Sequence, residues 1–286
     1  MIKILKSFIS YFEKKKEIFL INSDKDKDFV ISLIENQDLI AIDTEFEWRK
    51  TYFPILSLIQ IATKKYIFLI DCVECKNLEW LKKILESHKK LIVFHSVRSD
   101  ATVLNTNLKI KVKNAYDVQI AEKKINGGEI LNYGNLVENY FSINLDKSET
   151  NSNWLKRPLN EKQLSYAAND VNYLLELYQK QIKILKKQNI KNDAFLEIKN
   201  EVRLGNQELH ISRLKKLKKY SKFEKKLFMW RENFAKKQNI PPTQIFKNNL
   251  LKTLAKELNK KDFNEKNLNK ILKDSFILRK LIEDMT

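Results

Sequence analysis

Short apolar runs of strand length recur in the first part of the chain. They are rich in β-branched and aromatic side chains, which is typical of buried strands. The runs cover residues 39–42, 55–62, 66–70 and 91–94. Lys64 and Lys65 separate the second and third runs, so we predict a hairpin there. A short edge strand is expected at 114–118. Strands interspersed with helices predict an α/β domain with a mixed sheet.

Helical spacing of apolar residues is clearest over residues 160–187. Asn160 is a suitable N-terminal cap, and Gln163 follows three residues later, as in a capping box. We therefore predict one long helix over this range. Its apolar positions are Leu164, Ala167, Val171, Leu174, Tyr178, Ile182 and Leu185. Shorter helices are expected at 78–85 and 95–104.

The pattern changes after residue 205. No strand-like run follows, and residues 223–238 have apolar side chains at helical spacing until Pro241 and Pro242 break the pattern. Shorter helices are expected at residues 249–258, 265–273 and 275–283. The predicted parts of the chain are an N-terminal extension (1–19), an α/β domain (20–205) and a small all-helical domain (206–286).

The chain is strongly basic, with a formal net charge of +18. A protein of this charge usually has an anionic partner, either nucleic acid or an acidic membrane surface. A genome that favours lysine codons accounts for part of the excess. Between Arg213 and Lys237 the only acidic residues are Glu224 and Glu232. The positive charge is therefore concentrated near the first helix of the tail.

Cysteine content and hydropathy indicate the cellular compartment in which we expect the protein. The two cysteines, Cys72 and Cys75, exclude a disulfide framework and are typical of a reducing, cytoplasmic protein. No second cysteine pair is present, so we interpret them as incidental thiols rather than a redox motif or half of a zinc site. No apolar run is long enough to cross a membrane, and the charged N-terminus lacks the features of a signal peptide. We expect no membrane partner.

Two acids follow the first apolar run as Asp43-Thr44-Glu45. Residues i and i+2 of an extended chain point to the same side, so both carboxylates would face one point. Such a pair could bind a hard divalent cation, Mg²⁺ or Mn²⁺. By itself the pair is a weak indication, because solvated acids are common at strand ends.

Three further residues could join this pair. Asp100 lies on a predicted helix shortly after another strand. Tyr166 and Asp170 are four residues apart on the long helix and therefore share a face. Asp170 also has apolar neighbours, which places its carboxylate near the packed side, where it needs a partner.

The stretches around these residues resemble a known family, in order along the chain. Residues 42–46, 95–100 and 166–170 are similar to the three motifs of the DEDD exonucleases, and the tyrosine at 166 is typical of the DEDDy branch. Further stretches resemble RNase D, at residues 51–54, 58–60, 145–149, 154–159 and 163–166. In the tail, residues 230–232, Ala235, the two prolines and residues 250–254 resemble the HRDC module of that family.

The resemblance implies an RNase H-like mixed-sheet exonuclease domain followed by a small all-helical HRDC-like domain that binds nucleic acid. It implies that Asp43, Glu45, Asp100 and Asp170 hold two divalent cations, with Asp43 bridging both. Tyr166 would orient the attacking water, because a phenol with a pKa of about 10 is a poor base near neutral pH. The expected activity is that of a metal-dependent 3′–5′ exoribonuclease of RNase D type, which releases nucleoside 5′-monophosphates.

The same resemblance implies RNA as the partner, bound by its single-stranded 3′ end. The expected substrates are tRNA precursors with 3′ extensions, in tRNA 3′ maturation. Two alternatives stay open. A DNA-preferring DEDDy exonuclease would use the same carboxylates, because two-metal hydrolysis does not require a 2′-hydroxyl. A non-catalytic nucleic-acid-binding protein would be expected to have lost one of the acids or the tyrosine, and all five residues are present.

Five other residues are candidate substrate contacts. Phe46 could stack on the terminal base or pack in the core. His95 could approach the substrate or have a structural part. Lys147 and Arg157 could bind phosphates or be solvated. Trp154 could contact a base or anchor its loop.

Overall fold

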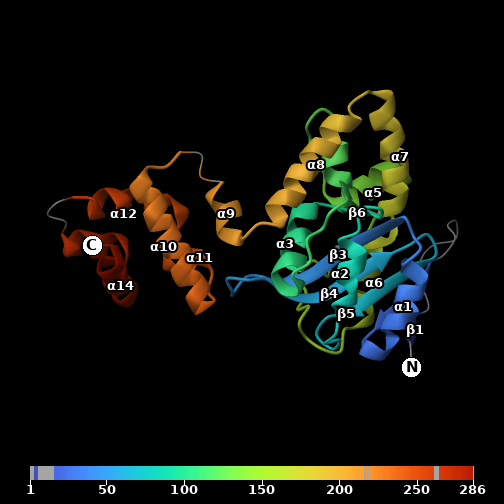
Figure 1. The fold of residues 1–286 in the computed structure, drawn as a ribbon, viewed down its shortest axis with the longest axis horizontal. Coiled ribbons are helices and arrows are strands. Elements are labelled where there is room, and N and C mark those ends of the chain that lie inside the picture. The colour runs from blue at the N-terminus through green and yellow to red at the C-terminus, as the bar shows by residue number, and fades with distance from the viewer. Residues whose placement is uncertain (1–2, 6–15, 216, 218, 261–263, 286) are drawn as a thin grey trace. The chain divides into compact units, whose positions relative to one another are not determined.

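The computed structural model describes residues 3–5, 16–215, 217, 219–260 and 264–285. The chain divides into two compact units. Figure 1 colours the chain by residue number, from blue at the N-terminus to red at the C-terminus. The first unit contains Met1–Glu47 and Ile55–Gln207, and the second contains Trp48–Pro54 and Glu208–Thr286. The division between Gln207 and Glu208 falls two residues after the boundary predicted between residues 205 and 206. The segment Trp48–Pro54, which we expected in the α/β domain, groups with the helices instead.

The described residues of the first unit form a mixed, seven-stranded sheet with the order β1-β2-β5-β4-β3-β6-β7. Antiparallel pairing joins β3 to β4 and β4 to β5, whereas β2 is parallel to β5, β6 to β3 and β7 to β6. The predicted mixed sheet, hairpin and edge strand are confirmed. The strands are β1 (Lys3–Leu5), β2 (Glu17–Ile21), β3 (Leu39–Glu47), β4 (Ile55–Ala62), β5 (Tyr66–Asp71), β6 (Leu91–Phe94) and β7 (Ala115–Asp117).

Helices pack around this sheet (Figure 1). The helices α3 and α6 both pack on β3 and β4, so both approach the strand that carries the first two acids. The elements are a 3₁₀ turn (Asp24–Asp26), α1 (Lys27–Ile34), α2 (Trp80–Leu85), α3 (Val97–Leu108), α4 (Val118–Ile125), α5 (Tyr133–Phe141), α6 (Glu161–Asn172), α7 (Leu174–Lys187) and α8 (Lys191–Gly205). Of the described helices in the whole chain, none has the length and hydropathy needed to span a bilayer.

The long helix predicted over residues 160–187 is wrong in one respect. It begins with the predicted capping box but consists of two helices, α6 and α7, that meet at Tyr173. In an unbroken helix the Tyr173 amide would donate to the Asn169 carbonyl. Here the Tyr133 hydroxyl donates to the Asn169 carbonyl (3.0 Å) and accepts from the Tyr173 amide (3.2 Å). A side chain inserted between the two groups interrupts the helical hydrogen-bond ladder.

The strand that carries the first two acids is longer than its apolar run. Asp43 and Glu45 lie within β3, which continues to Glu47 rather than ending near residue 42. β4 pairs with this stretch, with Gln60 opposite Asp43, and a bulge follows Glu45. The apolar pattern stops early because these side chains line a polar site, while the backbone pairing that defines the strand goes on.

The described part of the second unit is helical, as predicted. The helix before the prolines ends at Gln238, where Asn239 takes a left-handed conformation, so the prolines do not themselves break it. Pro242 instead opens a new helix, where its fixed φ fits the first helical turn. The elements are α9 (Leu209–Leu214), α10 (Lys222–Gln238), α11 (Pro242–Ile245), a 3₁₀ turn (Asn248–Leu250), α12 (Leu251–Leu258), α13 (Glu265–Ile271) and α14 (Ser275–Met285). The unit has its own apolar core, separate from that of the sheet unit.

The segment Trp48–Pro54 belongs to this second core through Tyr52, whose side chain is buried. The Tyr52 hydroxyl donates to a carboxylate oxygen of Glu232 (3.1 Å), and Arg213 donates to the same oxygen (2.8 Å). The Arg213 guanidinium also lies 4.7 Å from the centre of the Tyr52 ring. These partners are more than a hundred residues away along the chain, so the local pattern between two strands gave no sign of them.

The cysteines are free thiols, which agrees with their interpretation as incidental. Cys75 is buried, and burial raises the pKa of its thiol to about 11. A thiol with so high a pKa carries little thiolate near neutral pH, and thiolate is the reactive and metal-binding form.

Candidate active site

Three of the predicted acids meet at one point of the first unit. Asp43 and Glu45 come from β3, and Asp170 comes from the last turn of α6. One carboxylate oxygen from each lies within 4.8 Å of those of the other two, close enough to hold one metal ion. The i and i+2 spacing on β3 therefore places Asp43 and Glu45 on one side of the strand. The third acid, Asp170, comes from α6, which packs on β3.

Asp100 lies beside this group rather than within it. Its buried carboxylate accepts a hydrogen bond from the Thr44 hydroxyl (2.6 Å). Thr44, which lies between Asp43 and Glu45 on β3, therefore fixes the side chain of Asp100 on α3. The turn before Asp100 is fixed by Asp117, which accepts from the backbone amides of Ser96 (3.1 Å) and Val97 (2.8 Å). The sequence motif that contains Thr44 did not predict this hydrogen bond to Asp100.

The electrostatics of the four carboxylates indicate a cation site. Burial raises the pKa of Asp43 to about 7, and burial with the charges of the other three acids raises that of Glu45 to about 10. Burial and Asp43 raise the pKa values of Asp100 and Asp170 well above their ordinary range. Among the described residues, none of the salt bridges involves any of these four acids. Desolvated carboxylates without a basic partner suit a hard divalent cation, which prefers oxygen ligands.

Tyr166 lies one helical turn before Asp170 and shares its face, as predicted. Burial and the charge of Asp170 raise the pKa of the Tyr166 phenol above its ordinary value of 10. The phenol therefore stays protonated near neutral pH, which suits hydrogen bonding better than proton abstraction. Its oxygen lies 3.2 Å from the hydroxyl of Thr150. Sequence reasoning missed Thr150, although it directly follows a stretch that resembles RNase D.

The His95 ring contacts polar groups of the first unit. Its Nε2 atom lies 3.2 Å from the Leu131 carbonyl oxygen and 3.3 Å from the Gln119 side-chain nitrogen. Burial lowers the pKa of the ring, which is therefore neutral near pH 7. These contacts favour the structural interpretation, and contact with substrate stays a prediction.

Trp154 and Arg157 are packed into the protein. The Trp154 side chain is 4% exposed, which favours a loop anchor over a surface on which a base could stack. The guanidinium of Arg157 forms a two-point ion pair with Asp71 (2.6 and 2.7 Å). It also donates to the carbonyls of Trp154 (2.7 Å) and Ser57 (3.1 Å). Arg157 thus has a structural part that was not predicted, and its phosphate contact stays a prediction.

Replacing Arg157 by alanine should destabilise the first unit. The change leaves the Asp71 carboxylate buried without its cation, which typically costs about 3–5 kcal/mol of unfolding free energy. Chemical denaturation of the two proteins measures the difference. Lys156→Ala is the control, because Lys156 is the exposed neighbour on the same loop. A loss below about 1 kcal/mol, the range of exposed ion pairs, would contradict the structural part of Arg157.

Phe46 and Lys147 keep the alternatives that the sequence left open. The half-buried Phe46 packs against the core of the first unit and lies next to Glu45 at the bulge of β3. Lys147 is exposed, with its ammonium 3.5 Å from the Asn135 side-chain oxygen. Contact of either residue with substrate stays a prediction.

The basic stretch at the start of the second unit is partly neutralised internally. Arg231 is buried and donates to the Phe246 carbonyl (3.0 Å) and towards Glu232. Arg213 pairs with the same glutamate. These two arginines therefore support the helical core. Exposed lysines of α10 carry positive charge at the surface, at positions Lys222, Lys225, Lys226, Lys236 and Lys237.

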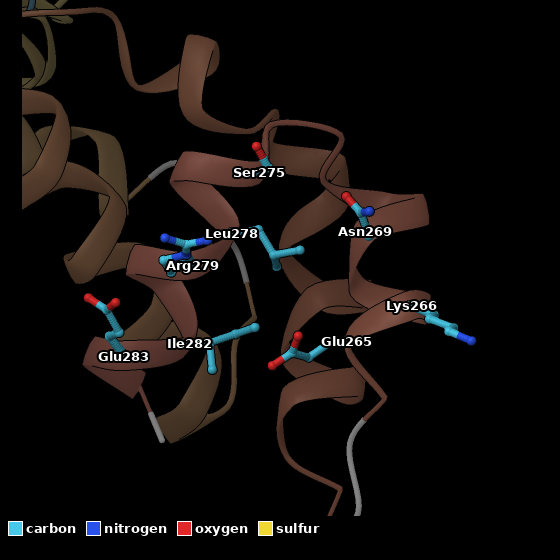
Figure 2. Close-up of a pocket in the computed structure, with 8 residues that line it drawn as sticks. All are labelled: Glu265, Lys266, Asn269, Ser275, Leu278, Arg279, Ile282 and Glu283. Atoms are coloured by element: carbon cyan, nitrogen blue, oxygen red, sulfur yellow. The ribbon is translucent and has the colours of Figure 1, made fainter.

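A cavity of about 460 Å³ lies between α13 and α14 of the second unit. Figure 2 shows Leu278 and Ile282 of α14 facing α13, with Glu265 across from them and Lys266 pointing away. Acidic and basic side chains alternate on its rim. Its lining residues are all from the helical unit, so this cavity is separate from the carboxylate site.

Comparisons with known proteins agree with this architecture. Residues 18–186 match a family described as 3′–5′ exonuclease, and residues 222–271 match the HRDC domain. The crystal structure of Escherichia coli RNase D, described as an exoribonuclease involved in structured RNA processing, matches with a TM-score of 0.78 and 23% identity. The match covers 93% of this chain and 74% of that one, and at this identity it concerns the fold.

Curated relatives of this chain are named ribonuclease D. Ribonuclease D of Desulfotalea psychrophila is 31% identical over 254 residues, which are 84% of this chain and 67% of that protein. Ribonuclease D of Haemophilus influenzae is 30% identical over 249 residues, which are 79% of this chain and 59% of that protein. The chain thus spans about three fifths to two thirds of the length of these relatives.

Proposed function

The chain belongs to the ribonuclease D family of 3′–5′ exonucleases, and on that premise we propose that it removes nucleotides one at a time from the 3′ end of RNA. The observation that carries the proposal is the meeting of Asp43, Glu45 and Asp170 within 4.8 Å, with Asp100 beside them. One buried acid and three half-buried ones, with no basic partner among the described salt bridges, are costly to keep together unless the fold uses them. Two divalent cations, Mg²⁺ or Mn²⁺, are the proposed occupants.

Each residue of the site has a distinct part in this proposal. Asp43 would be a ligand of both cations, Glu45 and Asp170 would join it in holding the cation that activates the attacking water, and Asp100 would help to hold the other. When bound, the cations lower the pKa of a water and offset the charge that develops on the phosphate. Tyr166, hydrogen-bonded to Thr150, orients the water from the face that it shares with Asp170.

The RNA preference is supported by the relatives rather than by the carboxylates. Those relatives are named ribonuclease D, and the structural neighbour is described as a processor of structured RNA. We propose tRNA precursors with 3′ extensions as substrates, because several stretches between residue 145 and Asp170 resemble RNase D. The HRDC domain, with its excess of lysine, would add phosphate contacts that do not depend on RNA sequence.

Paired digestion of RNA and DNA tests this function. Purified protein with Mg²⁺ or Mn²⁺ should shorten a 3′-extended tRNA and release nucleoside 5′-monophosphates, and excess EDTA should stop the reaction. Single-stranded DNA of the same sequence should be digested more slowly. Faster digestion of DNA would favour the DNA-preferring alternative. Release of no nucleotide with either metal would favour a non-catalytic nucleic-acid-binding protein.

A further inference from the structure

The end of α6 is shaped by a residue outside the set of acids. Asp170 lies in the last turn of α6, directly after Asn169 and three residues before Tyr173. The hydroxyl of Tyr133, at the start of α5, lies between the Asn169 carbonyl (3.0 Å) and the Tyr173 amide (3.2 Å). The two backbone groups that it joins therefore flank Asp170, and they are the pair that would bond directly in a continuous helix.

The Tyr133 side chain is suited to this position. It is 9% exposed, and its ring lies 5.8 Å from that of His95. Burial raises the pKa of the Tyr133 hydroxyl well above 10, so the group stays neutral and can donate and accept at the same time. A buried carbonyl or amide left without a partner would be costly, so this one hydroxyl stabilises both ends of the break.

A second side chain stabilises the same helix end. The ammonium of Lys16 donates to the Asn172 carbonyl and forms an ion pair with Glu176 (3.2 Å). Carbonyls in the last turn of a helix have no partner within the helix, so these long-range donors replace the missing amides. The end of α6, and with it the backbone of Asp170, is therefore held from outside the helix.

We propose that Tyr133 is a positioning residue for the carboxylate of Asp170, and so for the metal site that the proposed function requires. Its hydroxyl keeps α6 and α7 from joining into one continuous helix. The break sets the direction in which the last turn of α6 presents Asp170 towards Asp43 and Glu45. None of the described hydrogen bonds of Tyr133 joins it to the four acids, so it acts through the backbone on either side of Asp170.

The test is Tyr133→Phe, which retains the ring and removes only the hydroxyl. The Tyr173 amide can then donate directly to the Asn169 carbonyl, which draws α6 and α7 together and moves Asp170. We expect the Kd for Mn²⁺, measured by calorimetric titration of the full chain, to rise about 10- to 100-fold, as is usual when a residue that orients a ligand is lost. Hydrolysis should recover towards the wild-type kcat as Mn²⁺ is raised, because all ligands remain.

Tyr140→Phe is the matched control. Tyr140 lies on the same helix, and its hydroxyl donates to Glu122 (2.7 Å), away from Asp170. This variant should keep the wild-type Mn²⁺ affinity. Unchanged affinity in Tyr133→Phe, or an equal loss in both variants, would overturn the part assigned to Tyr133. Failure of the wild-type chain to bind Mn²⁺ would overturn the proposed metal site. The titration of the wild-type protein shows this outcome without either variant, so it is distinct from failure of the part assigned to Tyr133.

Discussion

Replacing Asp43 by asparagine should lower kcat at least about a thousandfold, because this carboxylate is proposed to bridge both cations and the cations supply several kcal/mol of transition-state stabilisation. RNA binding should largely survive, since contacts between lysine or arginine and phosphates carry most nucleic-acid affinity. The same variant should be at least as stable as the wild type without metal. In its charged form the Asp43 carboxylate is desolvated and repels Glu45, and an amide removes that charge.

Asp28→Asn provides the matched control for this experiment. Asp28 is an exposed acid in the first turn of α1, so the same chemical change there should leave kcat unaltered. Initial rates on RNA at saturating Mg²⁺ measure kcat, and thermal denaturation in EDTA measures stability. Activity of Asp43→Asn within tenfold of the wild type would refute the assigned site. A clear loss of metal-free stability would instead mean that the Asp43 carboxylate stabilises the fold.

The metal-free protein should become less stable as pH rises, and Mg²⁺ should reverse this trend. Burial raises the pKa of Asp43 from 3.8 to about 7, so the folded chain binds a proton that the unfolded chain releases. The resulting stability is complete below the unfolded value and is lost as pH rises through the folded value. The pKa of Glu45, raised to about 10, extends the loss into the alkaline range. A bound cation needs the charged carboxylates and removes their repulsion.

Thermal denaturation with EDTA and with Mg²⁺ measures this effect from about pH 5 to about pH 9. The rise in Tm caused by Mg²⁺ should grow with pH, because fewer protons have to be displaced from the acids. Other groups also titrate, so the pH profile of Asp43→Asn is subtracted to isolate this site. Mg²⁺ stabilisation that is independent of pH would contradict binding at the buried acids. A ligand at a hundred times its Kd adds about 2.7 kcal/mol, which is well within measurement.

Local patterns were sufficient for much of the fold. Strand-length apolar runs and the capping residues at Asn160 reflect preferences between near neighbours, and β4, β6 and the start of α6 formed where predicted. The two acids of β3 share a side because alternation along a strand is a property of the backbone. The order of the three motif stretches was also a property of the sequence alone, and all three lie within the residues that match the 3′–5′ exonuclease family.

The remaining features depend on partners that are distant along the chain. The Tyr133 hydroxyl lies at the break in a helix whose apolar spacing continues without interruption. Asp71 forms an ion pair with Arg157, for which the sequence left phosphate binding and solvation open. The segment Trp48–Pro54 leaves the sheet unit because Glu232 and Arg213 satisfy Tyr52 in the helical one. Hydrogen bonds and ion pairs of this kind gain free energy only when folding brings both partners together and removes water from them. The sequence by itself thus determined the elements and the acids, and the tertiary structure decided where α6 ends and how its last acid faces the other two.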